Sequence, residues 1–402
     1  MSTAAIVGVG LTPFGRFKDQ SLSQLAGQAV AAALADAGME PAEVQAAFVA
    51  NSMASVTTGQ VAVVGQAVLR PLGYSAIPVY NIDNACAASS SALDLAVQAV
   101  ESGRAEVVLV VGVEKLFGPA RSDSYRALNG AVDTEFLAAA NVDTAAESVF
   151  VTAIYPERLG RYRAKYGLQA RTLAEIAVKN RGNAALNPLA QYTAPISVDD
   201  VLGSRMVAEP LTALMCAPIS DGASAVVVTS ASLARSSGRR PVWIRGIATG
   251  MGAPPGPDTA VARIARRAFA EAGITPAEVD VAEVHDSIAF NELLAYEELG
   301  LCPAGEGARF AESGASSRSG RVPVNTSGGL ESRGHPVAAT GLAQIVELAL
   351  QLRHEAGHRQ VAGARIAVAE NAGGFVVDDT AAAVVTVLGA DPGPPGPSGP
   401  SG

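Results

Sequence analysis

Two stretches of the chain, residues 31–52 and 266–287, align without a gap, and half of their aligned positions are identical. In each copy an alanine-rich segment leads to a glycine, the phrase Pro-Ala-Glu-Val and an apolar run. This order predicts a helix that stops at Gly38 or Gly273, then a turn and a strand. The phrase alone is a common helix stop, but strands precede and follow both copies in the same order. We therefore expect two similar α/β halves facing each other across a pseudo-twofold axis.

The remaining pattern indicates how these halves divide the chain. Ala4–Gly10 is typical of a buried strand, Val107–Glu114 is a continuous apolar run typical of a parallel sheet, and Ser21–Ala37 has helical spacing. We expect an N-terminal half made of residues 1–115 plus an insertion, 116–232, and a C-terminal half at 233–390. The polar, arginine-bearing helices of the insertion predict a loop domain packed over the first half as the wall of a ligand cleft. The tail 391–402 is predicted to be disordered.

The composition excludes several classes of protein. With 402 residues and 49% hydrophobic side chains the chain can bury a large core, and its net charge of -9 argues against binding nucleic acid or anionic membranes. Three cysteines without CxxC spacing predict neither a disulfide framework nor a metal site, and favour a reducing cytoplasm. The N-terminal segment has no basic region and its apolar run is short, so neither a signal peptide nor a membrane span is expected.

One cysteine stands at a predicted helix start. In the stretch NIDNACAASSSALDLAVQAV, Cys86 follows a strand-like run and precedes a helical one. A thiol at a helix N-terminus lies near the positive end of the helix dipole, which favours the thiolate. The alternative is a buried structural cysteine that packs as a small hydrophobic side chain.

A histidine occupies the corresponding place in the second half. His335 and Pro336 come after a glycine-rich segment, and Pro336 suits the first position of a helix. The repeat makes this helix the counterpart of the helix that Cys86 begins, so the two helix starts are expected to approach each other. A cysteine beside a histidine is a nucleophile with its base, although a lone histidine in such a loop is more often structural.

Two further stretches carry candidate site residues. His285 and Asp286 end the repeated strand, where side chains reach the edge of the sheet. Another strand runs into Asn371-Ala372-Gly373-Gly374, whose backbone N–H groups suit an oxyanion. A plain glycine turn is the alternative for this segment.

These motifs, in this order and spacing, resemble those of the thiolase superfamily. NACAASSSAL, EVHDSIAFNELLAYEELGLC, GGLESRGHPVAATG and AENAGGF are most similar to the sterol-carrier-protein-type thiolases and to bacterial lipid-transfer-like acetyl-CoA acetyltransferases. The resemblance covers the chain to about Leu388. It implies a five-layered α-β-α-β-α fold, a homodimer or homotetramer, acyl-CoA substrates and no bound cofactor.

The resemblance also implies roles for individual residues. Cys86 resembles the nucleophile that becomes acylated, and His335 resembles the histidine that activates it and helps to bind the thioester oxygen. His285 takes the place of the histidine beside the oxyanion site. The backbone N–H groups of Cys86 and Gly373 would form a second oxyanion hole.

The chain departs from the family pattern at the second acid/base thiol. Thiolases carry this cysteine either where the chain has Asn371 or where it has Ser287. A serine hydroxyl is a poor replacement because it stays protonated near neutral pH. Cys216 and Cys302 lie in other motifs and are interpreted as packing thiols. The resemblance therefore supports acylation of Cys86 more strongly than carbon–carbon bond chemistry.

Three functions follow as hypotheses. The first is an acyl-CoA acyltransferase of lipid metabolism. The second is a retro-aldolase that cleaves β-hydroxyacyl-CoA together with a small OB-fold partner; in that branch we expect the histidine of the GHP motif to be altered, whereas His335 is present. The third is a non-catalytic acyl-CoA or lipid-binding protein. The arginines that could meet CoA phosphates are those of the insertion: Arg158, Arg161, Arg163, Arg171 and Arg181.

Overall fold

The computed structural model describes residues 3–139, 143–253, 256 and 258–393. Most of the tail predicted to be disordered, 391–402, lies outside the described residues. The strands are β1 (Ala4–Leu11), β2 (Ala46–Ala50), β3 (Val79–Ile82), β4 (Val107–Lys115), β5 (Met206–Ala208), β6 (Leu211–Thr212), β7 (Asp221–Ser230), β8 (Val242–Gly250), β9 (Val281–Glu283), β10 (Ile366–Val376) and β11 (Asp379–Gly389).

Helices fill the segments between the strands. They are α1 (Leu22–Ala37), α2 (Ala54–Thr57), α3 (Val64–Leu69), α4 (Ala88–Glu101), α5 (Arg121–Asn129), α6 (Thr134–Ala139), α7 (Tyr155–Tyr166), α8 (Ala170–Ala184), α9 (Val198–Gly203), α10 (Ala231–Ser236), α11 (Ala260–Ala272), α12 (Ala289–Glu298), α13 (Gly307–Glu312), α14 (Gly329–Arg333) and α15 (Thr340–Arg353).

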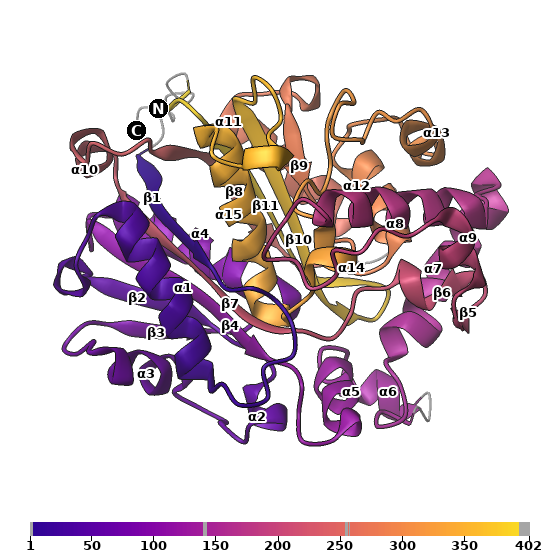
Figure 1. The fold of residues 1–402 in the computed structure, drawn as a ribbon, viewed down its shortest axis with the longest axis horizontal. Helices are drawn as coiled ribbons and strands as arrows, with labels where there is room; N and C mark the ends of the chain where they lie inside the picture. The colour runs from indigo at the N-terminus through magenta and orange to yellow at the C-terminus, as the bar shows by residue number, and fades with distance from the viewer. Residues whose placement is uncertain (1–2, 140–142, 254–255, 257, 394–402) are drawn as a thin grey trace.

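The larger strands form a mixed sheet in the order β3-β2-β4-β7-β1-β8-β11-β10-β9. Its two parts meet only at β1 and β8, where Ala5 pairs with Trp243 and Ile6 with Val242. Among the strands described here, parallel pairing joins β2 to β3 and β4, and β9 to β10. Figure 1 shows the N-terminal strands in indigo and violet beside the C-terminal strands β10 and β11 in yellow.

Alternate residues of these strands face different helical layers, as the period of two in a strand requires. Ala4 and Ile6 of β1 pack with the buried faces of α4 and α15, whereas Ala5 and Val7 pack with α1. On the far side, α11 and α12 cover β10 and β11. Helices α4 and α15 thus form a central layer between the two parts of the sheet, and the predicted five-layered α-β-α-β-α fold is confirmed.

The repeat detected in the sequence forms the same local structure twice. Helices α1 and α11 end at Gly38 and Gly273, whose φ angles are 67° and 64°. This left-handed conformation is accessible to glycine without strain. In each copy a 3₁₀ turn of three residues that begins with proline then leads into β2 or β9.

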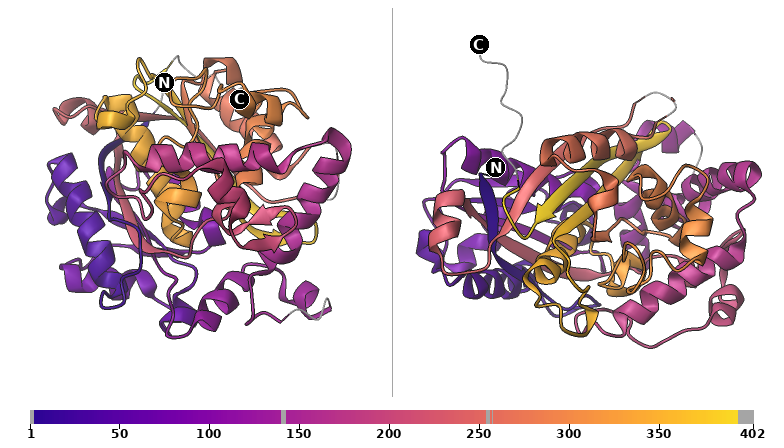
Figure 2. Two further views of the ribbon diagram at one scale, coloured as in Figure 1. Left: turned by 45° about the vertical axis from the view of Figure 1, so that its right-hand side comes forward. Right: turned by 90° about the horizontal axis from the view of Figure 1, so that it is seen from above.

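The predicted insertion, 116–232, differs from expectation in two ways. Its last segment is strand β7, which lies between β4 and β1 because its apolar run is buried on both faces. Its helices α7 and α8 pack against the second half rather than the first, since Leu159 and Ile176 share a core with Phe290 of α12. Both views in Figure 2 show these magenta helices beside the orange C-terminal elements. The outer limits of the two halves stay a prediction.

Close contact between α4 and α15 gives a test of the central layer. A Cβ atom at Gly341 would lie 2.0 Å from Ser90 Oγ, so Gly341→Ala should overpack the layer and destabilise the protein by about 1–3 kcal/mol. Gly160→Ala is the matched control, because Gly160 is an exposed position of α7 and nothing lies within 4 Å of its added Cβ. There the gain in helix propensity should stabilise the protein by about 0.5–1 kcal/mol. Urea unfolding measures both, and a Gly341→Ala protein as stable as the parent would contradict this packing.

Candidate active site

Cys86 lines a cavity of about 830 Å³. Strand β3 ends at Ile82, and the 3₁₀ turn Ala85–Ala87 carries the cysteine into α4. The helix start predicted from the sequence is therefore present. The cavity also brings His285, Ser287 and His335 to its lining.

His335 occupies the equivalent position at the start of α15. Gly334, with φ of 113°, ends α14, and the 3₁₀ turn Val337–Ala339 leads into α15. Pro336 is extended and precedes this turn instead of opening the helix. The Nε2 atom of His335 lies 3.4 Å from Cys86 Sγ. The structure thus joins the two helix starts as the repeat predicted.

The hydrogen bonds of His335 define which ring nitrogen acts as a base. Its Nδ1 lies 2.7 Å from Thr340 Oγ1, and this hydroxyl donates its own hydrogen to the carbonyl of Pro336 at 3.3 Å. Thr340 therefore accepts from Nδ1–H. The other nitrogen, Nε2, then carries a free lone pair that faces the Cys86 thiol.

His285 has the opposite tautomer. It lies two residues beyond β9, and its backbone N–H donates to Glu370 Oε2 at 2.8 Å. The side-chain amide of Asn371 lies 3.2 Å from His285 Nδ1 and donates to it, so the ring hydrogen is on Nε2. The two imidazole rings meet edge-on, with centroids 5.2 Å apart. The site therefore holds one imidazole that accepts and one that donates.

Burial sets the charges of these groups. Burial raises the pKa of Cys86 to about 12, the nearby Glu114 carboxyl adds to the rise, and backbone N–H groups of Gly374 and Cys86 partly oppose it. Burial lowers the pKa of His285 to about 3 and that of His335 well below its ordinary value. The expectation that the helix start favours a thiolate is thus wrong for the resting site, because desolvation outweighs the backbone donors. Thiol and imidazoles are all neutral at pH 7.

The segment Asn371–Gly374 belongs to β10 and is not a glycine turn. A Cβ at Gly373 would lie 2.4 Å from the carbonyl oxygen of Asn84 and 2.6 Å from the nitrogen of Ala87, so glycine alone allows β10 to approach the Cys86 turn. The next residue, Gly374, has φ of 64° and supplies the backbone N–H that reaches the sulfur. The role of the Gly373 N–H as an oxyanion donor stays a prediction.

A hydroxyl relay lies on the wall of the cavity. Asn291 Nδ2 donates to Ser287 Oγ at 2.8 Å, and Ser287 Oγ donates to Tyr155 Oη at 2.9 Å. Tyr155 comes from the insertion and was not among the predicted site residues. Cys216, interpreted as a packing thiol, also lines the cavity, whereas Cys302 does not.

The arginines of the insertion divide into two groups. Arg158 and Arg181 line the cavity, as do Arg16, Arg121 and Arg205, which the sequence did not single out. The other three predicted arginines make surface ion pairs, and these pairs are Arg161 with Glu157, Arg163 with Glu209, and Arg171 with Glu175.

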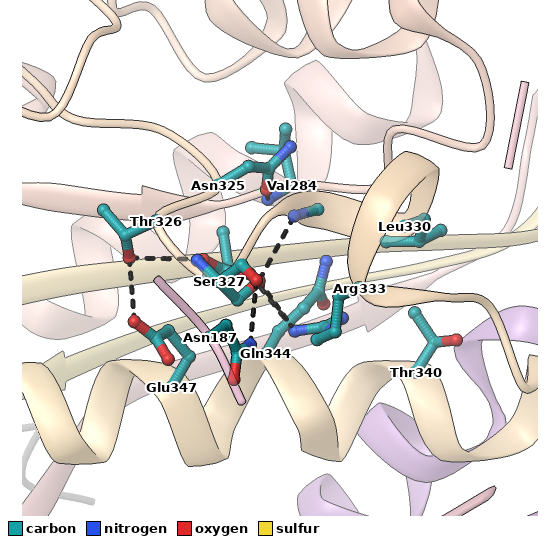
Figure 3. Close-up of polar contacts among 12 residues, drawn as sticks. Asn187, Val284, Asn325, Thr326, Ser327, Leu330, Arg333, Thr340, Gln344 and Glu347 are labelled. Carbon is teal, nitrogen blue, oxygen red and sulfur yellow. Dashed lines mark hydrogen bonds and ion pairs between the residues drawn. The ribbon is translucent and has the colours of Figure 1, made fainter. Parts of the chain in front are cut away.

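A buried polar network holds the segment before His335. Ser327 donates to Glu283 Oε2 at 2.6 Å and accepts from Arg333 at 3.1 Å, and Thr326 donates to Glu347 of α15 at 3.1 Å. Figure 3 shows Ser327 at the centre of these contacts, above the helix that carries Glu347. The network fixes the segment to β9 on one side and to α15 on the other.

Cys86, His285 and His335 also form the one group in the described chain whose potential metal-ligand atoms all lie within 4.8 Å of one another. The absence of a metal site stays a prediction. None of the helices described here has the length and apolar character that crossing a membrane demands.

The raised pKa of Cys86 gives a test of the site. Because alkylation by iodoacetamide requires the thiolate, the rate at Cys86 should rise about tenfold per pH unit from pH 6 to 10 without levelling. A reference peptide thiol should level above its pKa of about 8.5. Peptide mass spectrometry separates Cys86 from the other two cysteines. A plateau at Cys86 below pH 8 would contradict a neutral resting thiol.

Comparison with known proteins places this geometry in a family. The model "Thiolase, N-terminal domain" matches residues 4–232, and "Thiolase C-terminal domain-like" matches 253–389. An acetyl-CoA acetyltransferase of Methanothermobacter thermautotrophicus is 38% identical over 93% of this chain and 97% of its own length. The benzoylsuccinyl-CoA thiolase subunit BbsB of Thauera aromatica is 36% identical over 89% of this chain and 90% of its own length.

Human sterol carrier protein 2 is 35% identical over 92% of this chain and 69% of its own length. A solved structure described as "Ltp2-ChsH2(DUF35) aldolase" superposes with a TM-score of 0.81 at 27% identity, covering 97% of this chain and 98% of that one. Family models that cover both parts of the chain agree with the resemblance drawn from its motifs and with the five-layered fold. The chain belongs to the thiolase family.

Proposed function

We propose that this protein is an acyl-CoA acyltransferase that carries the acyl group on Cys86. The observation that carries the proposal is the 3.4 Å contact between Cys86 Sγ and His335 Nε2, with His335 held in the accepting tautomer by Thr340. A thiol with an adjacent, oriented base is the arrangement for nucleophilic catalysis. The acetyltransferase and thiolase relatives support the same class of reaction.

The chemistry follows from the neutral pair. His335 Nε2 takes the proton of the Cys86 thiol as the sulfur attacks the thioester carbonyl. His335 then gives this proton to the departing CoA thiolate. The backbone N–H of Cys86 and those of the Gly373–Gly374 segment stabilise the oxyanion on the acyl group. His285 Nε2–H donates to the oxygen of the second substrate. That second half-reaction is thiolysis of a β-ketoacyl-CoA, its reverse, or transfer of the acyl group to an acceptor other than CoA.

The substrate class rests on the cavity and on the relatives. An acyl-CoA has a phosphate-bearing end, and the arginines among the lining residues suit phosphate groups. Sterol carrier protein 2 among the relatives supports a place in lipid metabolism. In this proposal CoA thioesters are substrates, and the reaction takes no bound cofactor.

A retro-aldolase that acts with a small OB-fold partner is the second candidate. It is favoured by the aldolase structure that superposes over almost the whole chain at 27% identity. The intact Cys86–His335 pair argues against it, because aldol cleavage of a β-hydroxyacyl-CoA needs no acyl-cysteine. A protein that only binds acyl-CoA or lipid would not need the Cys86–His335 pair.

We also propose that the chain forms a homodimer or homotetramer in the cytoplasm. Strand β3 is the last strand at its end of the sheet among those described, and Tyr80 on it is 47% exposed. An open strand edge with an apolar side chain favours pairing with a second copy. The three free cysteines suit a reducing compartment.

Intact-protein mass spectrometry after incubation with acetyl-CoA and longer acyl-CoAs tests the proposal. We expect a mass gain of one acyl group together with free CoA, and no gain in Cys86→Ala. His335→Ala should slow acylation about 10²- to 10⁴-fold because the base is lost. Thr340→Val should slow it less, since only the orientation of the imidazole is weakened.

The absence of an adduct with every acyl-CoA tried would exclude the acyltransferase. Cleavage of a β-hydroxyacyl-CoA in the presence of an OB-fold partner would then identify the second candidate, and failure of that reaction would leave a binding role.

A further inference from the structure

The unpredicted Tyr155 brings a phenol hydroxyl to the cavity that holds Cys86. It is the first residue of α7 and follows the π-helical turn Phe150–Ile154. Such widened turns interrupt the register of a helix and are frequent at functional sites. Burial raises the pKa of Tyr155 to about 12, and negative charge on Cys86 would add to the rise.

The relay behind Tyr155 directs its hydrogen. Asn291 donates to Ser287, and Ser287 passes its own hydrogen to the phenol oxygen at 2.9 Å. The phenol is thus the acceptor at the end of the relay, and no protein acceptor for its hydrogen is found in the described part of the chain. That hydrogen is therefore available to a ligand in the cavity, and the Ser287 hydroxyl is placed to stabilise a phenolate if the hydrogen is lost.

Three neighbouring groups of the cavity already have hydrogen-bond partners. Ser287 gives its hydrogen to Tyr155, and the Cys216 thiol lies 3.5 Å from the carbonyl of Thr212. Glu370 accepts the backbone hydrogen of His285. None of these three groups takes up the phenol hydrogen of Tyr155.

We propose that Tyr155 is the general acid that protonates the carbanion released when a β-ketoacyl-CoA is cleaved at Cys86. The inference rests on the proposed function and names the group that serves its carbon–carbon step. His335 takes the Cys86 proton, the sulfur attacks the keto carbon, and the bond between this carbon and the α-carbon breaks. This gives acyl-Cys86 and the enolate of the shortened CoA thioester.

Tyr155 then gives its hydrogen to the α-carbon of the enolate. The proton that His335 took from Cys86 then returns the phenolate to its phenol form. Both His335 and Tyr155 are neutral again. In the second half-reaction, free CoA gives its thiol proton to His335, attacks acyl-Cys86 and releases Cys86, which takes that proton. Every proton and bond is accounted for by Cys86, His335, Tyr155 and the two substrates.

This division of roles predicts that one variant separates the two half-reactions. In Tyr155→Phe, acylation of Cys86 by acetyl-CoA should stay within about twofold of the parent, because it uses only Cys86 and His335. Thiolysis of acetoacetyl-CoA should fall about 10²- to 10⁴-fold, the usual loss when a general acid is removed. Tyr166→Phe, at the exposed end of the same helix, is the matched control and should keep both activities.

A second variant distinguishes an acid from a merely structural tyrosine. Ser287→Cys in the Tyr155→Phe background places a thiol beside the vacant position and should restore part of the thiolysis. Unchanged thiolysis in Tyr155→Phe, or equal loss of acylation and thiolysis, would overturn the proposal. A parent protein that acylates Cys86 but cleaves no β-ketoacyl-CoA would also overturn it, while leaving the proposed function intact. A parent that forms no adduct would refute the proposed function itself.

Discussion

The close approach of α4 to α15 in the central layer is the contact on which the site depends. Cys86 and His335 lie just before α4 and α15, far apart in the sequence, and the contact between these helices brings sulfur and nitrogen to 3.4 Å. Gly341 removes the side chain that would collide with Ser90, and Ser89 Oγ accepts the backbone hydrogen of Leu342 at 3.1 Å. Small residues after Cys86 therefore serve the geometry of the pair, since bulkier ones would force the helices apart.

Buried charges hold the two helix starts in place once the helices have met. Glu114 accepts backbone hydrogens from Met53 and Ala338, so one carboxyl ties the end of β2 to the turn after His335. Arg333 and Glu283 form an ion pair at 3.3 Å between two nearly inaccessible side chains. Removing either partner would leave the other charge unpaired, which is strongly destabilising. This requirement makes the segment before His335 rigid, and a rigid base is what an apolar site needs for proton transfer at a fixed distance.

The sequence predicted the parts of the molecule that repeat or that follow local rules. The glycine caps of α1 and α11 and the meeting of Cys86 with His335 follow from the aligned stretches, whereas the five layers were implied by the resemblance to thiolases. Strand β7 was assigned to the insertion because nothing in its own pattern says that it returns to the sheet between β4 and β1. The charge of Cys86 was misjudged because a helix start is visible in sequence and burial is not. Tyr155 could not be found at all, since its contact with Ser287 spans 132 residues and no periodicity connects them.

The relay also gives a physical reason for a serine where a second thiol would be expected. A buried serine hydroxyl is too weak an acid to give up its hydrogen, but it is well suited to donate a hydrogen bond to a neighbouring oxygen. The Ser287 hydroxyl donates to Tyr155 and stabilises its phenolate. The tyrosine, and not the serine, is then the group that gives up a proton. A phenol is a weaker acid than a thiol in its unperturbed state, and burial here makes it weaker still. Such a group protonates a carbanion readily but is rarely ionised at neutral pH. The same group serves both directions of the step, because the phenol gives its hydrogen in cleavage and the phenolate takes one from carbon in condensation.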